Sequence, residues 1–201
     1  MTVDLTQRKQ WLVYSFFLLF VSLSLAYDNG IIAAGNIIGE GELLIFLSSL
    51  RFWLHAFATP SLVLVSYHIL RCSGAKFAKN SITNMAAWLI TLGLVIYQVV
   101  SSTLYEVKNL TSIQEYGVLR YTAEGHYGPP MMVIIVGIML LFVGIIVLVK
   151  QKWVWLFVGT TLLFVGQLIP FPVESGASTN VFELILIVSI WRTTTSLKPH
   201  T

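Results

Sequence analysis

Five stretches of this chain are apolar over roughly the length that a helix needs to cross a lipid bilayer, and this limits the fold more than any other feature. The hydrocarbon core is about 30 Å thick, which takes roughly 20 apolar residues at 1.5 Å rise per residue. The five stretches lie at about residues 11–27, 52–71, 82–105, 129–149 and 153–171. A sixth, at about 177–195, reaches this length only with its polar ends included. The sequence therefore predicts an all-α fold, a polytopic bundle of six transmembrane helices forming one domain over residues 1–201.

The composition agrees with this class and excludes others. Of the 201 residues, 56% are hydrophobic and 10% are charged, whereas soluble domains carry about 25% charged residues. Such a chain is too apolar for intrinsic disorder and lacks the dense basic patch of a nucleic-acid binder. Cys72 is the single cysteine in the sequence, which excludes a disulfide framework and a multi-cysteine metal site. The expected partner is the lipid bilayer, and no nucleic acid is expected.

The few charges are sorted by side. Lys and Arg accumulate in short cytoplasmic loops, and a cytoplasmic N-terminus places nine of the 12 cations in inner segments: Arg8, Lys9, Arg71, Lys76, Lys79, Lys150, Lys152, Arg192 and Lys198. Seven of the nine acids fall in outer segments: Asp28, Glu40, Glu42, Glu106, Glu115, Glu124 and Glu174. This distribution predicts an even number of spans with both termini cytoplasmic.

The first span has a second interpretation. Residues 8–26 combine a basic start with an apolar run and end in Ser24-Leu25-Ala26, which is similar to a signal-peptide cleavage site. Cleavage there would leave five spans. We favour a retained first helix, because the run is long enough to cross a bilayer and continues into the apolar segment 31–34.

Two outer connections are expected, at 28–50 and 106–128. The first contains four glycines and then an apolar stretch at 43–47. This stretch predicts a short interfacial helix at about 41–50, which Arg51 separates from the second span. Two further glycine pairs, Gly137 with Gly144 and Gly159 with Gly166, are each spaced seven apart on one helix face. Small residues of this kind allow helix backbones to approach closely.

Polar residues within the spans are the best pointers to function, because a charge at mid-depth costs about 2.5–3.5 kcal/mol on the insertion scale. Most of them fall toward the outer side. Arg51, His55 and Thr59 form a stripe at i, i+4 and i+8 on one helix face. We therefore expect a polar cavity open to the outside. Its candidate binding residues are Arg51, His55, Thr59, Gln98, Gln167 and Glu183, with Glu124 and His126 as a lid.

Glu183 is the most informative of these residues, because it lies about two turns inside the last span. A carboxyl group at that depth is expected to be protonated, paired with His55 or Arg51, or bound to a cation. An alternative stays open: the polar groups hydrogen-bond one another and hold the helices together, as is common in membrane bundles.

A metal site or other cofactor is not established by the sequence. His55, His126 and Glu183 are side chains of the kind that bind zinc, but their spacing is not diagnostic, and no His-Glu-x-x-His motif occurs. His55 with His126 is also the one pair placed for haem ligation, since His68 lies toward the inner surface.

Three classes of function remain open at this level. The first is a protein that binds or conducts a small polar or cationic species through the outer cavity. The second is a membrane-embedded enzyme acting on a lipid or apolar substrate, with His55, His126 and Glu183 in acid–base or metal-binding roles. The third is a structural or assembly subunit that docks against another membrane protein or a second copy of itself. No motif identifies a reaction, so the sequence does not decide whether the chain is an enzyme.

Overall fold

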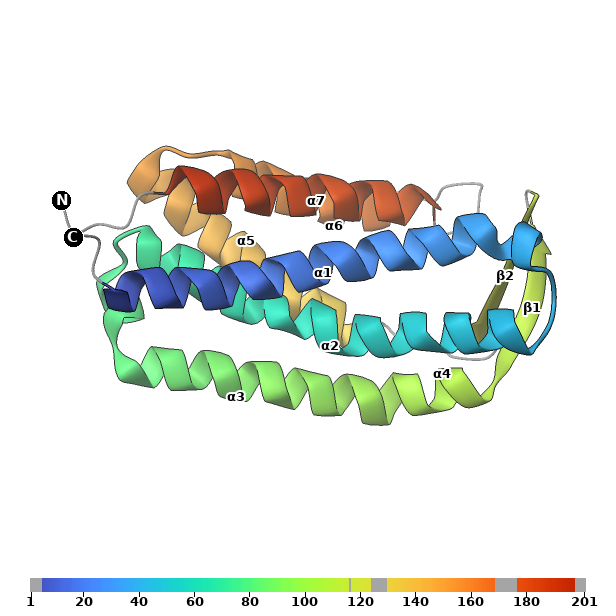
Figure 1. Ribbon diagram of the computed structural model, residues 1–201. Coiled ribbons are helices and arrows are strands. Elements are labelled where there is room, and N and C mark those ends of the chain that lie inside the picture. Colours follow the sequence, from blue (N-terminus) through green and yellow to red (C-terminus); the bar gives the residue numbers. More distant parts are fainter. Residues whose placement is uncertain (1–4, 116, 124–129, 169–176, 198–201) are drawn as a thin grey trace.

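The computed structural model describes residues 5–115, 117–123, 130–168 and 177–197. Long helices run back and forth along one axis, and a small β-hairpin lies at one end (Figure 1). The elements are α1 (Leu5–Ile38), α2 (Glu42–Cys72), η1 (Lys76–Lys79), α3 (Ser81–Gln98), η2 (Val99–Thr103), α4 (Leu104–Lys108), β1 (Leu110–Glu115), β2 (Val118–Ala123), α5 (Met131–Gln151), α6 (Trp155–Leu168) and α7 (Ala177–Ser196).

The first two helices are longer than expected, and the outer connection predicted at 28–50 is almost entirely helical. At 1.5 Å per residue, α1 (34 residues) and α2 (31 residues) are about 51 and 46 Å long. Only residues 39–41 separate them, and Gly39 and Gly41 take the positive φ angles that close the turn. The separate interfacial helix expected at 41–50 is wrong: this segment is the beginning of α2.

The sequence prediction failed here because it took Arg51 and the glycines as helix breakers. Arg51 lies inside α2 and forms an ion pair with Asp28 of α1. Gly30 and Gly35 lie inside α1, where a glycine weakens a helix by only about 1 kcal/mol relative to alanine. The apolar residues around them continue the helix, which therefore extends beyond the thickness of a hydrocarbon core.

The β-hairpin is a second correction, because the fold was expected to be all-α. Strands β1 and β2 pair antiparallel, with Leu110 opposite Ala123 and Glu115 opposite Val118. The hairpin packs on the projecting ends of α1 and α2 through a small apolar cluster of Leu44, Leu119 and Tyr121. Asn36 of α1 also donates a hydrogen bond from Nδ2 to the carbonyl of Gly117. The hairpin thus covers the far end of the α1–α2 pair.

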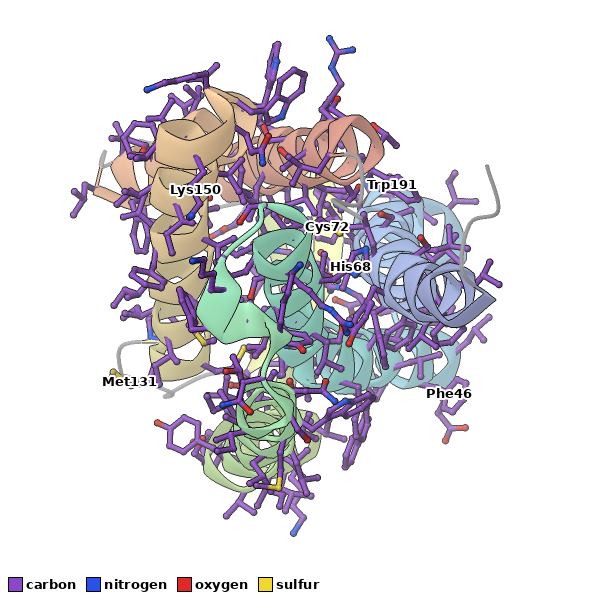
Figure 2. All side chains as sticks on the ribbon, turned by 90° about the vertical axis from the view of Figure 1, so that its left-hand side faces the viewer. Phe46, His68, Cys72, Met131, Lys150 and Trp191 are labelled. Carbon is purple, nitrogen blue, oxygen red and sulfur yellow. The ribbon has the colours of Figure 1, made fainter. Side chains whose placement is uncertain are left out.

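Helix α2 lies at the centre of the bundle, with α1, α3 and α5 around it (Figure 2). Its second half is the most buried segment of the described chain, and Ala56, Leu64 and Val65 are fully enclosed. Pro60 lies within α2 without ending it. The main core joins this half of α2 to buried residues of α1, α5, α6 and α7.

The glycine pairs mark close helix packing, as the sequence predicted. A Cβ atom on Gly144 would lie 3.0 Å from backbone atoms of Phe157, so α5 and α6 approach through this position. Gly137 faces the ring of Phe164 of α6. Gly159 and Gly166 contact α7 instead, against Ser189 and Phe182. The two faces of α6 thus pack on different neighbours, α5 and α7.

Within the described residues, four helices are long and apolar enough to cross a membrane: Leu12–Ile38, Glu42–Cys72, Ser81–Lys108 and Met131–Gln151. Their outer faces carry many exposed apolar side chains, which soluble proteins rarely display over a large area. On α3 these include Ile82, Met85, Leu89, Leu92 and Ile96, and Val100 of η2 continues the row. The fold therefore supports a membrane protein.

Candidate functional site

A cavity of about 570 Å³ opens among the helices, in the half of the bundle that lies toward the β-hairpin. Residues of α1, α2, α5 and α7 line it, together with the continuous segment α3–η2–α4. From α6, Leu163 contributes to the wall. A volume of this size lies within the range of about 300–1,000 Å³ found for small-molecule sites.

The lining is divided by depth. Toward the hairpin end it contains most of the polar side chains, beside the apolar Phe52 and Met131; the polar ones are Asp28, Arg51, His55, Thr59, Gln98, Ser101, Ser102, Glu106, Asn180 and Glu183. Toward the middle of the bundle it is apolar, with Val21, Leu62, Leu140, Leu163, Leu186 and Ile187. On α2 the distance from Arg51 to Leu62 is 11 residues, or about 16 Å along the helix. The cavity is therefore a polar mouth above an apolar floor.

An ion pair stands at the mouth. Arg51 donates from Nε to Oδ1 of Asp28 at 2.7 Å, and this contact joins α2 to α1. Asp28 also lies close enough for its charge to act on His55 and on Glu183. The charge of Glu106 reaches His55 as well. Two acids thus act on the imidazole. With Glu183, the cavity is lined by three acidic side chains and one permanent cation, Arg51.

His55 is held on α2 by a local contact and faces the cavity. Its Nδ1 atom lies 3.2 Å from the hydroxyl of Thr59, one helical turn further on. Among the described residues, Nε2 has no hydrogen-bond partner, so this nitrogen is available to a ligand. Neutral imidazole has one donor and one acceptor nitrogen, and the bond to Thr59 therefore determines which role Nε2 takes.

Glu183 reaches the cavity from α7 and is partly buried. In the part of the chain that the structure describes, neither its carboxyl group nor the amide of Gln98 has a hydrogen-bond or ion-pair partner. One turn nearer the hairpin, Asn180 donates from Nδ2 to Oδ1 of Asn29 at 2.8 Å, which fixes the start of α7 against α1. Glu183 is thus a firmly placed acid whose oxygens face the cavity unpaired.

The wall formed by α3 has an unusual backbone. Residues Val99–Thr103 form a π-helical segment between α3 and α4, a rare conformation that occurs often at functional sites. Ser101 and Ser102 of this segment line the cavity. The wider π-helical turn shifts the register, so that Gln98, both serines and Glu106 contribute to the same wall.

The structure brings together five of the eight residues that the sequence singled out: Arg51, His55, Thr59, Gln98 and Glu183 all line this cavity. Gln167 is not among the residues that line it. It is exposed on α6, because α6 packs on α5 and α7 on the outside of the bundle. Glu124 and His126 lie outside the described residues.

Sequence reasoning missed Asp28, Glu106 and Asn180 as members of the cavity. Asp28 and Glu106 were assigned to outer loops, whereas both lie on helices that continue past the expected ends of the spans. A signal for Asp28 was present, because Ser24 and Asp28 are spaced i, i+4 and so share one helix face. That signal is visible only if the first helix is extended beyond residue 27.

The described residues contain no group of three or more His, Cys, Asp or Glu side chains placed to hold a metal ion. His68, at the opposite end of α2, stacks on Tyr14 with ring centroids 4.6 Å apart. Its Nε2 atom lies 3.6 Å from the sulfur of Cys72, and Figure 2 shows both residues at that end of the bundle. His68 is therefore separate from the cavity.

Comparisons with protein-family models, with curated proteins and with solved structures found no match to this chain. The fold and the cavity alone define its class: a helical protein of membrane type, with a polar-mouthed cavity between its helices.

Proposed function

We propose that the chain is a multi-pass integral membrane protein with six membrane-spanning helices and both termini in the cytoplasm. Besides the four long apolar helices, α6 and α7 run alongside them as a further antiparallel pair (Figure 1). The cation-rich connections at η1 and between α5 and α6 lie at the end of the bundle opposite the hairpin. The positive-inside rule assigns that end to the cytoplasm.

We further propose that the cavity binds a small cationic molecule from the outer side. The observation that carries this proposal is Glu183, an acid that faces the cavity and has no ion-pair partner among the described residues. An ionised carboxylate removed from bulk water needs a partner charge. Asp28 has one in Arg51, whereas Glu106 and Glu183 have none among the described residues. A bound ammonium group would supply it.

The size of the cavity favours an organic cation over a simple ion. A water molecule has a share of about 30 Å³ in the liquid, so 570 Å³ holds roughly 20 groups of that size. A proton or metal ion would use a small part of this space. His55, with Nε2 facing the cavity, and the unpaired amide of Gln98 add hydrogen-bonding groups that can orient a larger molecule.

Equilibrium dialysis of radiolabelled butylammonium against the protein in lipid nanodiscs tests the proposal, with empty discs as background. Replacing Glu183→Gln removes the charge and keeps the shape. We expect the affinity to fall by about tenfold or more, because a hydrogen bond to a charged group contributes about 1.5–3 kcal/mol.

Glu40→Gln is the matched control. Glu40 lies exposed in the turn between α1 and α2 and does not line the cavity. The Glu40→Gln substitution removes the same charge at the same end of the molecule, so this variant should bind butylammonium with the same affinity as the parent. Equal affinities for the parent and Glu183→Gln, with the variant folded, would overturn the proposal.

A further inference from the structure

The cavity has two chemically different halves, and only its polar half is used by a small ammonium ion. The floor is formed by aliphatic side chains from four helices, among them Val21 of α1, Leu62 of α2, Leu140 of α5 and Ile187 of α7. None of these lining side chains carries a hydrogen-bonding group. A purely polar ligand would leave this half filled with water that has few partners, which is unfavourable.

From this division we infer that the ligand is a single-tailed amphiphile, with an ammonium head group at Glu183 and an apolar tail on the cavity floor. The inference rests on the proposed binding of a cation at the mouth and adds the nature of the rest of the molecule. Along α2 the polar and apolar linings together extend about 16 Å from Arg51 to Leu62. This length suits a head group followed by an extended alkyl chain.

The volume limits the ligand to one tail. Room for roughly 20 water-sized groups accommodates a head group and a medium-length chain. A phospholipid with two acyl chains contains more than twice as many non-hydrogen atoms and does not fit. A two-chain lipid would therefore not be enclosed by the cavity, whereas a lipophilic amine or similar single-tailed organic cation fits within it.

Chain length provides the test. Burying one methylene group contributes about 0.8 kcal/mol, which raises the affinity about fourfold. We expect octylammonium to bind roughly 250-fold more tightly than butylammonium when both affinities are expressed as free aqueous ligand, measured by dialysis on nanodiscs with empty discs subtracted. Equal affinities for the two compounds would overturn the inference while leaving the role of Glu183 intact.

Variants of the floor separate binding in the cavity from partition into the bilayer. Val21→Phe enlarges a side chain that lines the floor, whereas Leu19→Phe makes a comparable enlargement on the outward face of the same helix. The gain from the longer chain should persist in Leu19→Phe and shrink by at least tenfold in Val21→Phe. A gain that is the same in both variants would show that the tail lies in the bilayer, and the inference would be wrong.

A second pair of variants keeps the test valid if Val21→Phe misfolds. Ile187→Phe changes the floor from α7 instead of α1, and Val188→Phe is its exposed neighbour. The same contrast is expected between these two. If Glu183→Gln abolishes binding but neither floor variant alters the chain-length dependence, a cation site exists and the amphiphile is excluded. If Glu183→Gln has no effect, the cation site itself is wrong.

Discussion

The Nε atom of Arg51 lies 2.7 Å from Oδ1 of Asp28, although the two residues are 23 positions apart on different helices. Arg51 is 11% exposed and Asp28 is 31% exposed, so the pair is partly screened from solvent. Each residue alone would place a charge between apolar helices. Together they neutralise each other, which allows α1 and α2 to continue through this level as unbroken helices.

Removing one partner of this pair should destabilise the protein, and removing both should restore much of the loss. We expect Arg51→Gln or Asp28→Asn alone to lower the free energy of unfolding by about 1–3 kcal/mol, less than for a fully buried pair because both groups keep some solvent contact. The double variant should be more stable than the sum of the single losses predicts. Unfolding of the purified protein in detergent measures these values.

The pair formed by Arg120 and Glu115 on the hairpin is the control. Its atoms are 3.6 Å apart and Glu115 is 37% exposed, so Glu115→Gln should change stability by at most about 1 kcal/mol. Additive losses in the Asp28–Arg51 cycle would mean that the contact between α1 and α2 contributes no coupling energy.

Gly35 is predicted to be essential for docking of the hairpin. A Cβ atom at this position would overlap the backbone carbonyl of Leu119 in β2, and a backbone atom cannot move aside as a side chain can. We expect Gly35→Ala to destabilise the protein by about 1–3 kcal/mol through overpacking. Tryptic cleavage at Arg120 should also become faster.

Gly30 provides the matched substitution on the same helix. No atom lies within 4 Å of a Cβ built at Gly30, and alanine favours a helix over glycine by about 1 kcal/mol. Gly30→Ala should therefore leave cleavage unchanged and stability equal or higher. If both variants behave alike, the hairpin does not depend on the close approach at Gly35.

Packing of α5 on α6 yields a parallel prediction at Gly144. Its Cβ would meet the Cα and N atoms of Phe157 at 3.0 Å, so Gly144→Ala should lower the unfolding temperature, with a loss of about 1–3 kcal/mol. Gly93, on the open face of α3, has no neighbouring atom within 4 Å. Gly93→Ala should not lower the unfolding temperature, and an equal loss in both variants would exclude the proposed packing role.

Most of the long helices could be located from the sequence, because their apolar runs are long and uninterrupted. Residues 131–149, for example, contain no charged side chain. The extensions of α1 and α2 could not be located in this way. Gly30, Gly35 and Arg51 are local signals for a break, and they are outweighed by the contact with Asp28 and by the hairpin, which are distant in the sequence.

The hairpin had a readable signal that was overlooked. Residues 110–115 and 118–123 are rich in Thr, Ile, Val and Tyr and flank Gly117, a pattern typical of two strands joined by a tight turn. Long apolar spans on either side made a loop the simpler expectation. The lesson is that an outer connection in such a chain can have its own core, here Leu44, Leu119 and Tyr121.

The cavity was partly predictable for a physical reason. The distribution of charges assigns each loop to one side of the membrane, and this gives every residue of a span an approximate depth. His55, Gln98 and Glu183 could therefore be placed at one level without knowing how the helices pack. Depth does not determine which way a side chain faces around its helix. Gln167 has the right depth and lies on the exposed face of α6, and only the three-dimensional packing distinguishes it from Gln98.

The orientation of the chain is the last prediction, and labelling of single cysteines tests it. Cys72 is the one native cysteine, so Cys72→Ser provides a background without thiols. Ser112→Cys places a thiol on the exposed side of the hairpin, and Thr195→Cys places one near the end of α7, at the opposite end of the bundle. Neither substitution changes the charge distribution on which the orientation depends.

A membrane-impermeant maleimide should label Ser112→Cys in intact cells and Thr195→Cys only after permeabilisation. This follows because, within the described residues, eight of the 12 Lys and Arg residues of the chain belong to segments at the end that contains residue 195, and such residues accumulate in the cytoplasm. The reverse pattern would place the cavity mouth inside the cell. Labelling of both sites in intact cells would mean an even number of crossings between residues 112 and 195, instead of the three formed by α5, α6 and α7. The hairpin and the C-terminal end would then lie on the same side, which contradicts the six-helix topology.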